Sequence, residues 1–105
     1  MSKVIYISGK ITGATDYKSK FAVAEKLIRD KFPIAEIINP AKNYVDERGI
    51  NPQQIWDAYM SISRRQVKRS TLIVYLPCWT RSAGAREEIS LAQKLRINTK
   101  PISEL

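Results

Sequence analysis

The feature that most constrains the fold is the run L-I-V-Y-L at Leu72–Leu76, the strongest strand signal in the chain. Its β-branched and aromatic residues form a continuous apolar segment with the length of a buried strand. A second run of this kind, K-V-I-Y-I-S, lies at Lys3–Ser8, and shorter strands are expected at Ala35–Ile38 and Thr99–Ile102. The sequence therefore predicts a small sheet of about four strands.

Segments with helical signals separate these strands. Apolar residues at helical spacing predict an amphipathic helix over roughly Tyr17–Lys31. The run Asn51-Pro52-Gln53-Gln54 supplies a cap, a first-turn proline and a capping-box glutamine, so a second helix should extend from there to about Arg69. A third helix is expected over about Ser82–Leu95. Strands that alternate with helices imply right-handed crossovers and a mainly parallel sheet.

The loops that follow the strands are the natural place for a ligand, because parallel sheets bind ligands at the carboxyl ends of their strands. Three segments should converge there: Gly9–Ala14, the segment from Asn39 onward, and Pro77–Gly84. Gly9 and Gly13 would let the backbone approach an anion closely. The sequence S-G-K-I-T-G is neither a Walker A loop nor a G-x-G-x-x-G motif, so an ordinary strand-to-helix turn explains it equally well.

The amino-acid composition limits the kinds of fold and of catalytic site that the chain can form. The 105 residues suit one domain, 1–105, and 44% hydrophobic with 27% charged residues fits a globular protein. No apolar run reaches the length of a membrane span, no signal peptide is evident, and Cys78 is the one cysteine, so we expect a cytoplasmic protein. The absence of histidine excludes Ser-His-Asp and Cys-His nucleophile pairs and argues against zinc, so we expect no metal and no cofactor.

The net charge of +8 favours anionic partners. Nucleotides, nucleic acids and acidic proteins all satisfy that condition, and charge alone does not separate them. The basic residues that crowd the end of the second helix, from Arg64 to Arg69, are also favourable there for a simpler reason, because cations stabilise the carboxyl end of any helix.

Two adjacent glutamates at the start of the third helix should face different ways. Glu87 shares a polar row with Ser90 and Lys94, so it should face solvent and pair weakly with Lys94. Glu88 borders the buried side, facing the converging loops. A carboxylate there either hydrogen-bonds loop amides and locks the Pro77–Gly84 turn, or serves as a nucleophile or base at the ligand crevice.

Four short motifs, in order along nearly the whole chain, carry a family resemblance. They are Y-I-S-G-K-I-T-G at Tyr6–Gly13, N-P-A at Asn39–Ala41, L-P-C-W at Leu76–Trp79 and S-A-G-A-R-E-E at Ser82–Glu88. Together they resemble the nucleoside 2-deoxyribosyltransferase superfamily, and in particular a compact bacterial and phage branch of it. More distantly, the chain is similar to the 2'-deoxynucleoside 5'-monophosphate N-glycosidases.

The resemblance implies a three-layer flavodoxin-like α/β fold and a glutamate that attacks the sugar C1' as the base departs. Water or a second base then resolves the covalent intermediate. The glutamate matches Glu88, and the tyrosine that orients it matches Tyr6. The remaining matches are to substrate-binding residues: Ser82 and Gly84 at the phosphate or 5'-hydroxyl, and Ile11, Thr12 and Gly13 over base and sugar. With Gly9, Asn39 and Ser63, these form the candidate site.

The sequence departs from the family at three positions. Family aspartates on the second helix and before the third strand align with Ser63 and Thr71, and an arginine of the monophosphate glycosidases aligns with Thr12. Because serine cannot protonate a leaving base, we expect slow N-glycosidase or deoxyribosyltransferase-like activity on a nucleoside or nucleotide. The alternatives are a non-catalytic nucleotide-binding domain of the same fold and, less favoured, a small basic nucleic-acid-binding protein. A homodimer or larger homo-oligomer is expected, with Trp56, Tyr59 and Trp79 as candidate interface residues.

Overall fold

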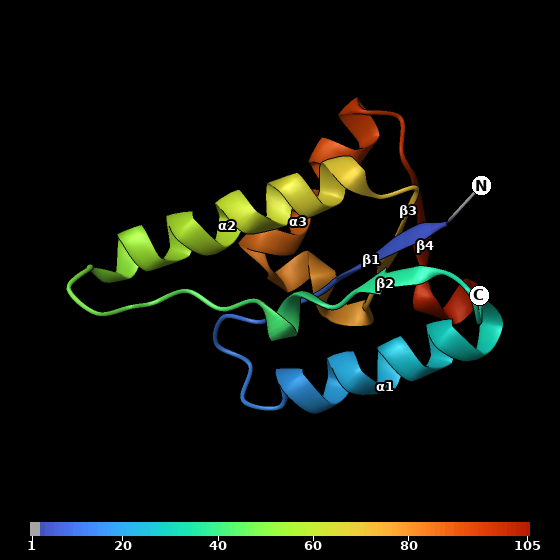
Figure 1. The fold of residues 1–105 in the computed structure, drawn as a ribbon, viewed down its shortest axis with the longest axis horizontal. Coiled ribbons are helices and arrows are strands. Elements are labelled where there is room, and N and C mark those ends of the chain that lie inside the picture. The colour runs from blue at the N-terminus through green and yellow to red at the C-terminus, as the bar shows by residue number, and fades with distance from the viewer. Residues whose placement is uncertain (1–2) are drawn as a thin grey trace.

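A four-stranded parallel sheet forms the centre of the protein in a computed structural model that describes residues 3–105 (Figure 1). The strand order is β2-β1-β3-β4, and every neighbouring pair is parallel. The strands are β1 (Val4–Ser8), β2 (Glu36–Ile38), β3 (Leu72–Tyr75) and β4 (Asn98–Pro101). This is the strand order of flavodoxin-like sheets, in which β1 and β3 are adjacent and flank the point where the winding reverses.

Helices cover both faces of the sheet, which gives three layers (Figure 1). Helix α1 (Tyr17–Lys31) lies on one side, and α2 (Pro52–Arg69) and α3 (Ala83–Lys94) lie on the other. Alternate residues of β1 point to opposite faces. Ile5 and Ile7 therefore pack towards α1, whereas Tyr6 packs with residues of α2 and α3. The predicted three-layer flavodoxin-like fold is confirmed.

The helix starts follow from local chemistry. Asn51 caps α2 through a complete capping box: its Oδ1 accepts from the Gln54 amide at 2.8 Å, and its own amide donates to Gln54 Oε1 at 3.0 Å. At α3, Ser82 Oγ accepts from the Ala85 amide at 3.1 Å. Both starts were predicted from the sequence, and they fix where α2 and α3 stand over the carboxyl edge of the sheet.

Three short 3-10 turns occupy segments predicted as loops or strand ends. They are η1 (Pro40–Lys42), η2 (Pro77–Arg81) and η3 (Ile102–Glu104). Two apolar residues expected on buried helix faces are exposed instead: Leu27 by 53% and Leu95 by 46%. Leu95 follows the last residue of α3, where the chain already leaves the sheet, and Leu27 faces outward from α1. Within residues 3–105, no helix has the length and apolarity needed to cross a bilayer.

Candidate active site

Glu88 is buried, with 7% of its surface exposed, and its carboxyl group faces β1, one of the two central strands. The Tyr6 hydroxyl donates to Glu88 Oε2 at 2.8 Å, and the Ser8 hydroxyl donates to Glu88 Oε1 at 2.8 Å. Each carboxyl oxygen therefore has its own hydroxyl donor. The two donors are two positions apart on one strand, so they stand on the same face of the sheet.

Burial raises the pKa of Glu88 from its ordinary 4.5 to about 7. The hydroxyls of Ser8, Tyr6 and Ser63 oppose that rise because they stabilise the ionised form, and the charge of Glu87 adds to it slightly. Desolvation outweighs these donors, so Glu88 changes charge near neutral pH.

Tyr6 is suited to hold this carboxyl group in place. Its side chain is fully buried, and burial and the charge of Glu88 raise its pKa well above the ordinary value of 10.0. The phenol therefore stays protonated across the physiological range and remains a hydrogen-bond donor. Tyr6 does not line the open cavity; it supports Glu88 from within the sheet, as an orienting residue would.

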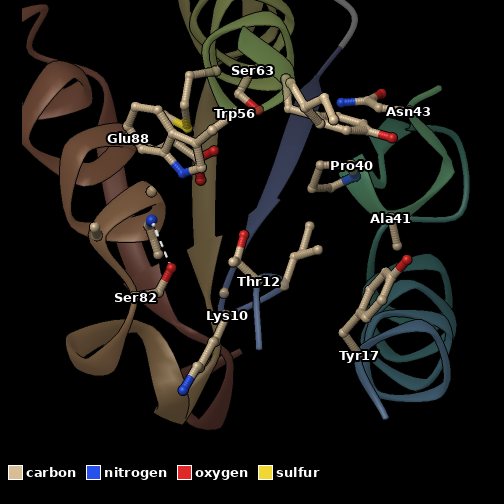
Figure 2. A pocket seen from close by; sticks show the side chains of 18 of the residues that line it. Lys10, Thr12, Tyr17, Pro40, Ala41, Asn43, Trp56, Ser63, Ser82 and Glu88 are labelled. Atoms are coloured by element: carbon tan, nitrogen blue, oxygen red, sulfur yellow. Dashed lines mark hydrogen bonds between the residues drawn. The ribbon is translucent and has the colours of Figure 1, made fainter. Parts of the chain in front are cut away.

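A cavity of about 750 Å³ opens in front of Glu88, above the carboxyl ends of β1 and β3 (Figure 2). Its walls come from the loop after β1, η1, the loop after η1, α2 and the start of α3. Of the residues predicted for the site, the cavity brings together Gly9, Ile11, Thr12, Ser63, Ser82, Gly84 and Glu88. Ser63 is itself buried and lies near both Tyr6 and Glu88, as the inward-facing row on α2 predicted.

Two predicted substrate-binding residues lie elsewhere. Asn39 is buried outside the cavity wall, with its amide already used on both sides: Nδ2 donates to Glu25 Oε1 at 3.0 Å, and Oδ1 accepts from the Ala41 amide at 3.0 Å. Its role here is to cap η1. Gly13 is absent from the cavity lining and has φ of +79°, the left-handed backbone that a tight turn requires of glycine.

Other expectations about the site also need correction. A Cβ on Gly9 would lie 2.9 Å from Leu76 Cδ1, so close packing against Leu76 is by itself a reason for glycine at this position. Thr71 bonds the backbone of Val4 at the amino end of β3, far along the strand from the cavity edge. Glu87 pairs with Arg64 at 2.5 Å, and not with Lys94.

Sequence reasoning missed several residues of the site. Ser8 was recoverable, because the strand period places it on the same face as Tyr6. Trp56 and Tyr59 were named only as candidate interface residues, yet both are half-buried in the cavity wall. Lys10 and Arg81 bring positive charge to the cavity beside Ser82, at the amino end of α3.

The cavity lining thus has a positively charged part and an aromatic part. Lys10, Arg81 and Ser82 share the end next to η2 and α3, where positive charge and free helix amides favour an anion. Trp56 and Tyr59 supply aromatic faces from α2. In Figure 2, Trp56 lies next to Glu88, Ser82 lies farther along the wall, and the Lys10 side chain extends beyond Ser82, away from Glu88. Over residues 3–105, no group of three or more His, Cys, Asp and Glu side chains is placed to hold a metal ion.

Fold and site together define a flavodoxin-like α/β protein with a buried, hydroxyl-bound glutamate at the carboxyl edge of its sheet. The chain belongs to the DUF4406 family, described as a domain of unknown function, which matches residues 3–100. No curated protein matches the chain.

One solved structure similar to the chain is the crystal structure of a conserved protein from Enterococcus faecalis V583. The two are 21% identical with a TM-score of 0.72, and the match covers 96% of this chain and 63% of that one. The chain therefore spans less than two thirds of the length of that protein, and the likeness establishes the shared fold. Neither match names the nucleoside 2-deoxyribosyltransferase superfamily, so that relationship stays a prediction.

Proposed function

We propose that this protein is a nucleoside or nucleotide N-glycosidase of the deoxyribosyltransferase-like kind, with Glu88 as the nucleophile. The observation that carries the proposal is the Glu88 carboxyl group, buried against Tyr6 and Ser8 and open to the cavity on its other side. Burying a carboxyl group against only hydroxyl donors, with no cation as partner, raises its pKa and costs stability. Such a cost is typical of a group retained for its chemistry.

In the proposed reaction, a Glu88 carboxylate oxygen forms a bond to the sugar C1' while the C1'–N bond to the base breaks. The electron pair of that bond leaves with the base nitrogen, which takes a proton from solvent. Water then attacks C1', giving its proton to solvent and releasing Glu88 as the carboxylate, or a second base takes the place of water. The oxocarbenium-like transition state is stabilised by the nearby anion, as in retaining glycosidases.

The ends of the cavity suit the two ends of a nucleotide. Lys10, Arg81 and the first amides of α3 offer positive charge to a 5'-phosphate. Trp56 and Tyr59 offer flat apolar surface to a base. Because Glu88 lines the same cavity beside Trp56, a nucleotide bound in this way would bring its sugar C1' to the proposed nucleophile. A volume of about 750 Å³ is ample for one nucleotide.

A non-catalytic nucleotide-binding domain is the second candidate, favoured by the serine at position 63. The cavity has no carboxylic acid at that point of α2 to protonate a departing base, and serine is far too weak an acid. A nucleic-acid-binding role is less favoured, because two of the four basic residues at the end of α2 are held in ion pairs, Arg64 with Glu87 and Arg69 with Glu36.

The test is release of free base from a set of 2'-deoxynucleosides and their 5'-monophosphates, followed by chromatography. Glu88→Gln should abolish release, because the amide is not a nucleophile. Glu87→Gln is the matched control, since it makes the same change one residue away on a side chain that faces Arg64. Release that survives Glu88→Gln would overturn the proposal. Nucleotide binding without any release in either protein would favour the non-catalytic candidate.

A further inference from the structure

The cavity has a second carboxylate, Glu47, which the proposed reaction does not use. Among the residues that line the cavity, Glu47 and Glu88 are the two acids. Glu47 lies in the long loop that joins η1 to α2, and its side chain is exposed to solvent. The bland interpretation is a solvated surface glutamate. Three observations about its surroundings indicate instead that Glu47 can contact a ligand in the cavity.

First, both ends of this loop are fixed. Near its start, Asn43 and Gln66 exchange two hydrogen bonds through their side-chain amides, each 2.9 Å long. At its end, the capping box of Asn51 and Gln54 anchors the loop to α2. A loop held at both ends keeps its middle residues over the cavity.

Second, Glu47 meets a residue of the cavity wall. The Tyr59 hydroxyl lies 3.5 Å from Glu47 Oε2. Burial and the charge of Glu47 raise the pKa of Tyr59, so the phenol stays protonated and can only donate towards the carboxylate. This contact places the Glu47 carboxylate beside Tyr59, in the aromatic region of the cavity.

Third, the carboxylate keeps free acceptor capacity. The neighbouring residues Asp46 and Arg48 form their own ion pair at 2.8 Å. Within residues 3–105, Glu47 has no ion-pair partner within 4.0 Å and a single long contact to Tyr59. An ionised carboxylate has two oxygens and about four acceptor sites, so most of them are available to a ligand.

A nucleotide bound for attack by Glu88 has its C1' beside that residue, with the phosphate towards Lys10 and Arg81. Its base then extends along Trp56 and Tyr59, and the edge farthest from C1' faces the Glu47 side. That edge carries the 4-substituent of pyrimidines and the 6-substituent of purines. An amino group there donates to a carboxylate, whereas an oxo group would place one acceptor against another.

We propose that Glu47 is the specificity-determining residue of this cavity, accepting a hydrogen bond from the exocyclic amine of a cytosine- or adenine-type base and disfavouring the oxo counterpart. The proposal rests on the proposed function for the direction in which the nucleotide lies. Discrimination by one such polar pair is commonly tenfold or more, because the wrong base leaves a charged acceptor facing another acceptor.

The test is titration calorimetry with two matched pairs of probes, dCMP against dUMP and dAMP against dIMP. The unsubstituted protein should bind the amino member about tenfold or more tightly in each pair. Glu47→Gln should bring the ratio below about threefold, because a carboxamide can present either a donor or an acceptor. Asp46→Asn is the control: it removes the same charge from the same loop on a side chain outside the cavity lining, so the ratio should persist.

Failure of this inference differs from failure of the proposed function. Equal binding within each pair, or a ratio that Glu47→Gln leaves unchanged, overturns the role of Glu47 even where base release still depends on Glu88. Absence of binding by all four nucleotides overturns both. Because Glu47 is exposed, Glu47→Gln should fold normally, which circular dichroism would verify.

Discussion

The Tyr6 hydroxyl lies 2.8 Å from Glu88 Oε2, although 82 positions separate the two residues in the chain. Ser8 makes the matching contact to the other oxygen. Strand β1 thus acts as the support on which the carboxyl group of α3 is held, and the properties of Glu88 depend on hydroxyls from a distant segment.

Base release should rise with pH and level off above an apparent pKa of about 7, because attack requires the ionised carboxylate and burial sets the pKa of Glu88 there. Tyr6→Phe removes a donor that favours the ionised form, so its profile should shift to higher pH. Tyr44→Phe, on a residue 79% exposed, is the control. A rate that stays flat between about pH 5 and 9 would contradict the prediction.

Glu88 should also make the stability of the protein fall as pH rises from about 4.5 to about 7. Its pKa is raised in the folded state, so the folded protein binds more protons than the unfolded chain in this window, and the free energy of unfolding decreases across it. With a pKa of 4.5 in the unfolded chain and about 7 in the folded protein, the loss is roughly 3 kcal/mol and is complete above pH 7.

Glu88→Gln cannot titrate, so urea denaturation should show it gaining stability relative to the unsubstituted protein between pH 4 and pH 8, by about that amount. Glu87→Gln is the control, because it removes one negative charge from the same helix without removing the buried carboxyl group. If the stability difference between Glu88→Gln and the unsubstituted protein is the same at both pH values, burial does not perturb Glu88 as described.

Ser63→Asp should accelerate base release by about tenfold to a hundredfold, provided that leaving-group protonation limits the rate. Position 63 is buried beside Tyr6 and Glu88, where a second carboxyl group would be protonated near neutral pH and could donate to the base. Ser63→Asn, which has the same shape without the acidity, should give no gain. A slower Ser63→Asp protein would show that another group protonates the base.

Trp56→Ala should weaken nucleotide binding by about 1 to 3 kcal/mol, roughly fivefold to more than a hundredfold in Kd, because it removes an aromatic face from the cavity wall. Trp79→Ala provides the comparison. Trp79 packs edge-on against Tyr75, with ring centroids 5.4 Å apart, and lies outside the cavity lining. Equal losses in the two variants would indicate a general effect on folding and not loss of base contact.

The protein is expected to form a homodimer or larger homo-oligomer. The exposed apolar residues of α1 are a further candidate for its interface, beside the aromatic residues named from the sequence. Trp56 and Tyr59 line the cavity, whereas Val23 and Leu27 are 61% and 53% exposed on α1 beside a groove of about 480 Å³. Light scattering at micromolar concentration should give at least twice the mass of 12.0 kDa, and Leu27→Lys should reduce it. A monomer in both cases would refute the prediction.

Local signals in the sequence were enough to predict the layers and the position of Glu88. Long apolar runs define the strands, and the cap at Asn51 defines the start of α2, because these signals depend on neighbours in the chain. Helical spacing then separates Glu88 from Glu87. The pKa of Glu88 was not predictable from such local signals, because it depends on burial of the carboxyl group against β1 and α2, which are distant in sequence.

The errors share one cause, which is contact between residues far apart in sequence. Asn39 was predicted to bind substrate, but Glu25 occupies its amide from α1. Glu47 lies in a polar loop without periodicity, and the fixed ends of that loop and the contact with Tyr59 place it at the cavity. Partners of this kind are chosen by tertiary packing, which a single sequence does not encode in its local pattern.

The distance in sequence between β1 and α3 also bears on how the chain would acquire the proposed activity. The hydroxyls of β1 meet Glu88 only when β3 lies beside β1 and α3 has docked on the sheet, so the proposed nucleophile is positioned by contacts that span about 80 residues. If refolding is followed by the recovery of base release, that signal should therefore appear only when the whole sheet has formed. It should appear later than the signal of helix formation. Any partial opening that lifts α3 from β1 would therefore abolish the proposed activity before the protein as a whole had unfolded.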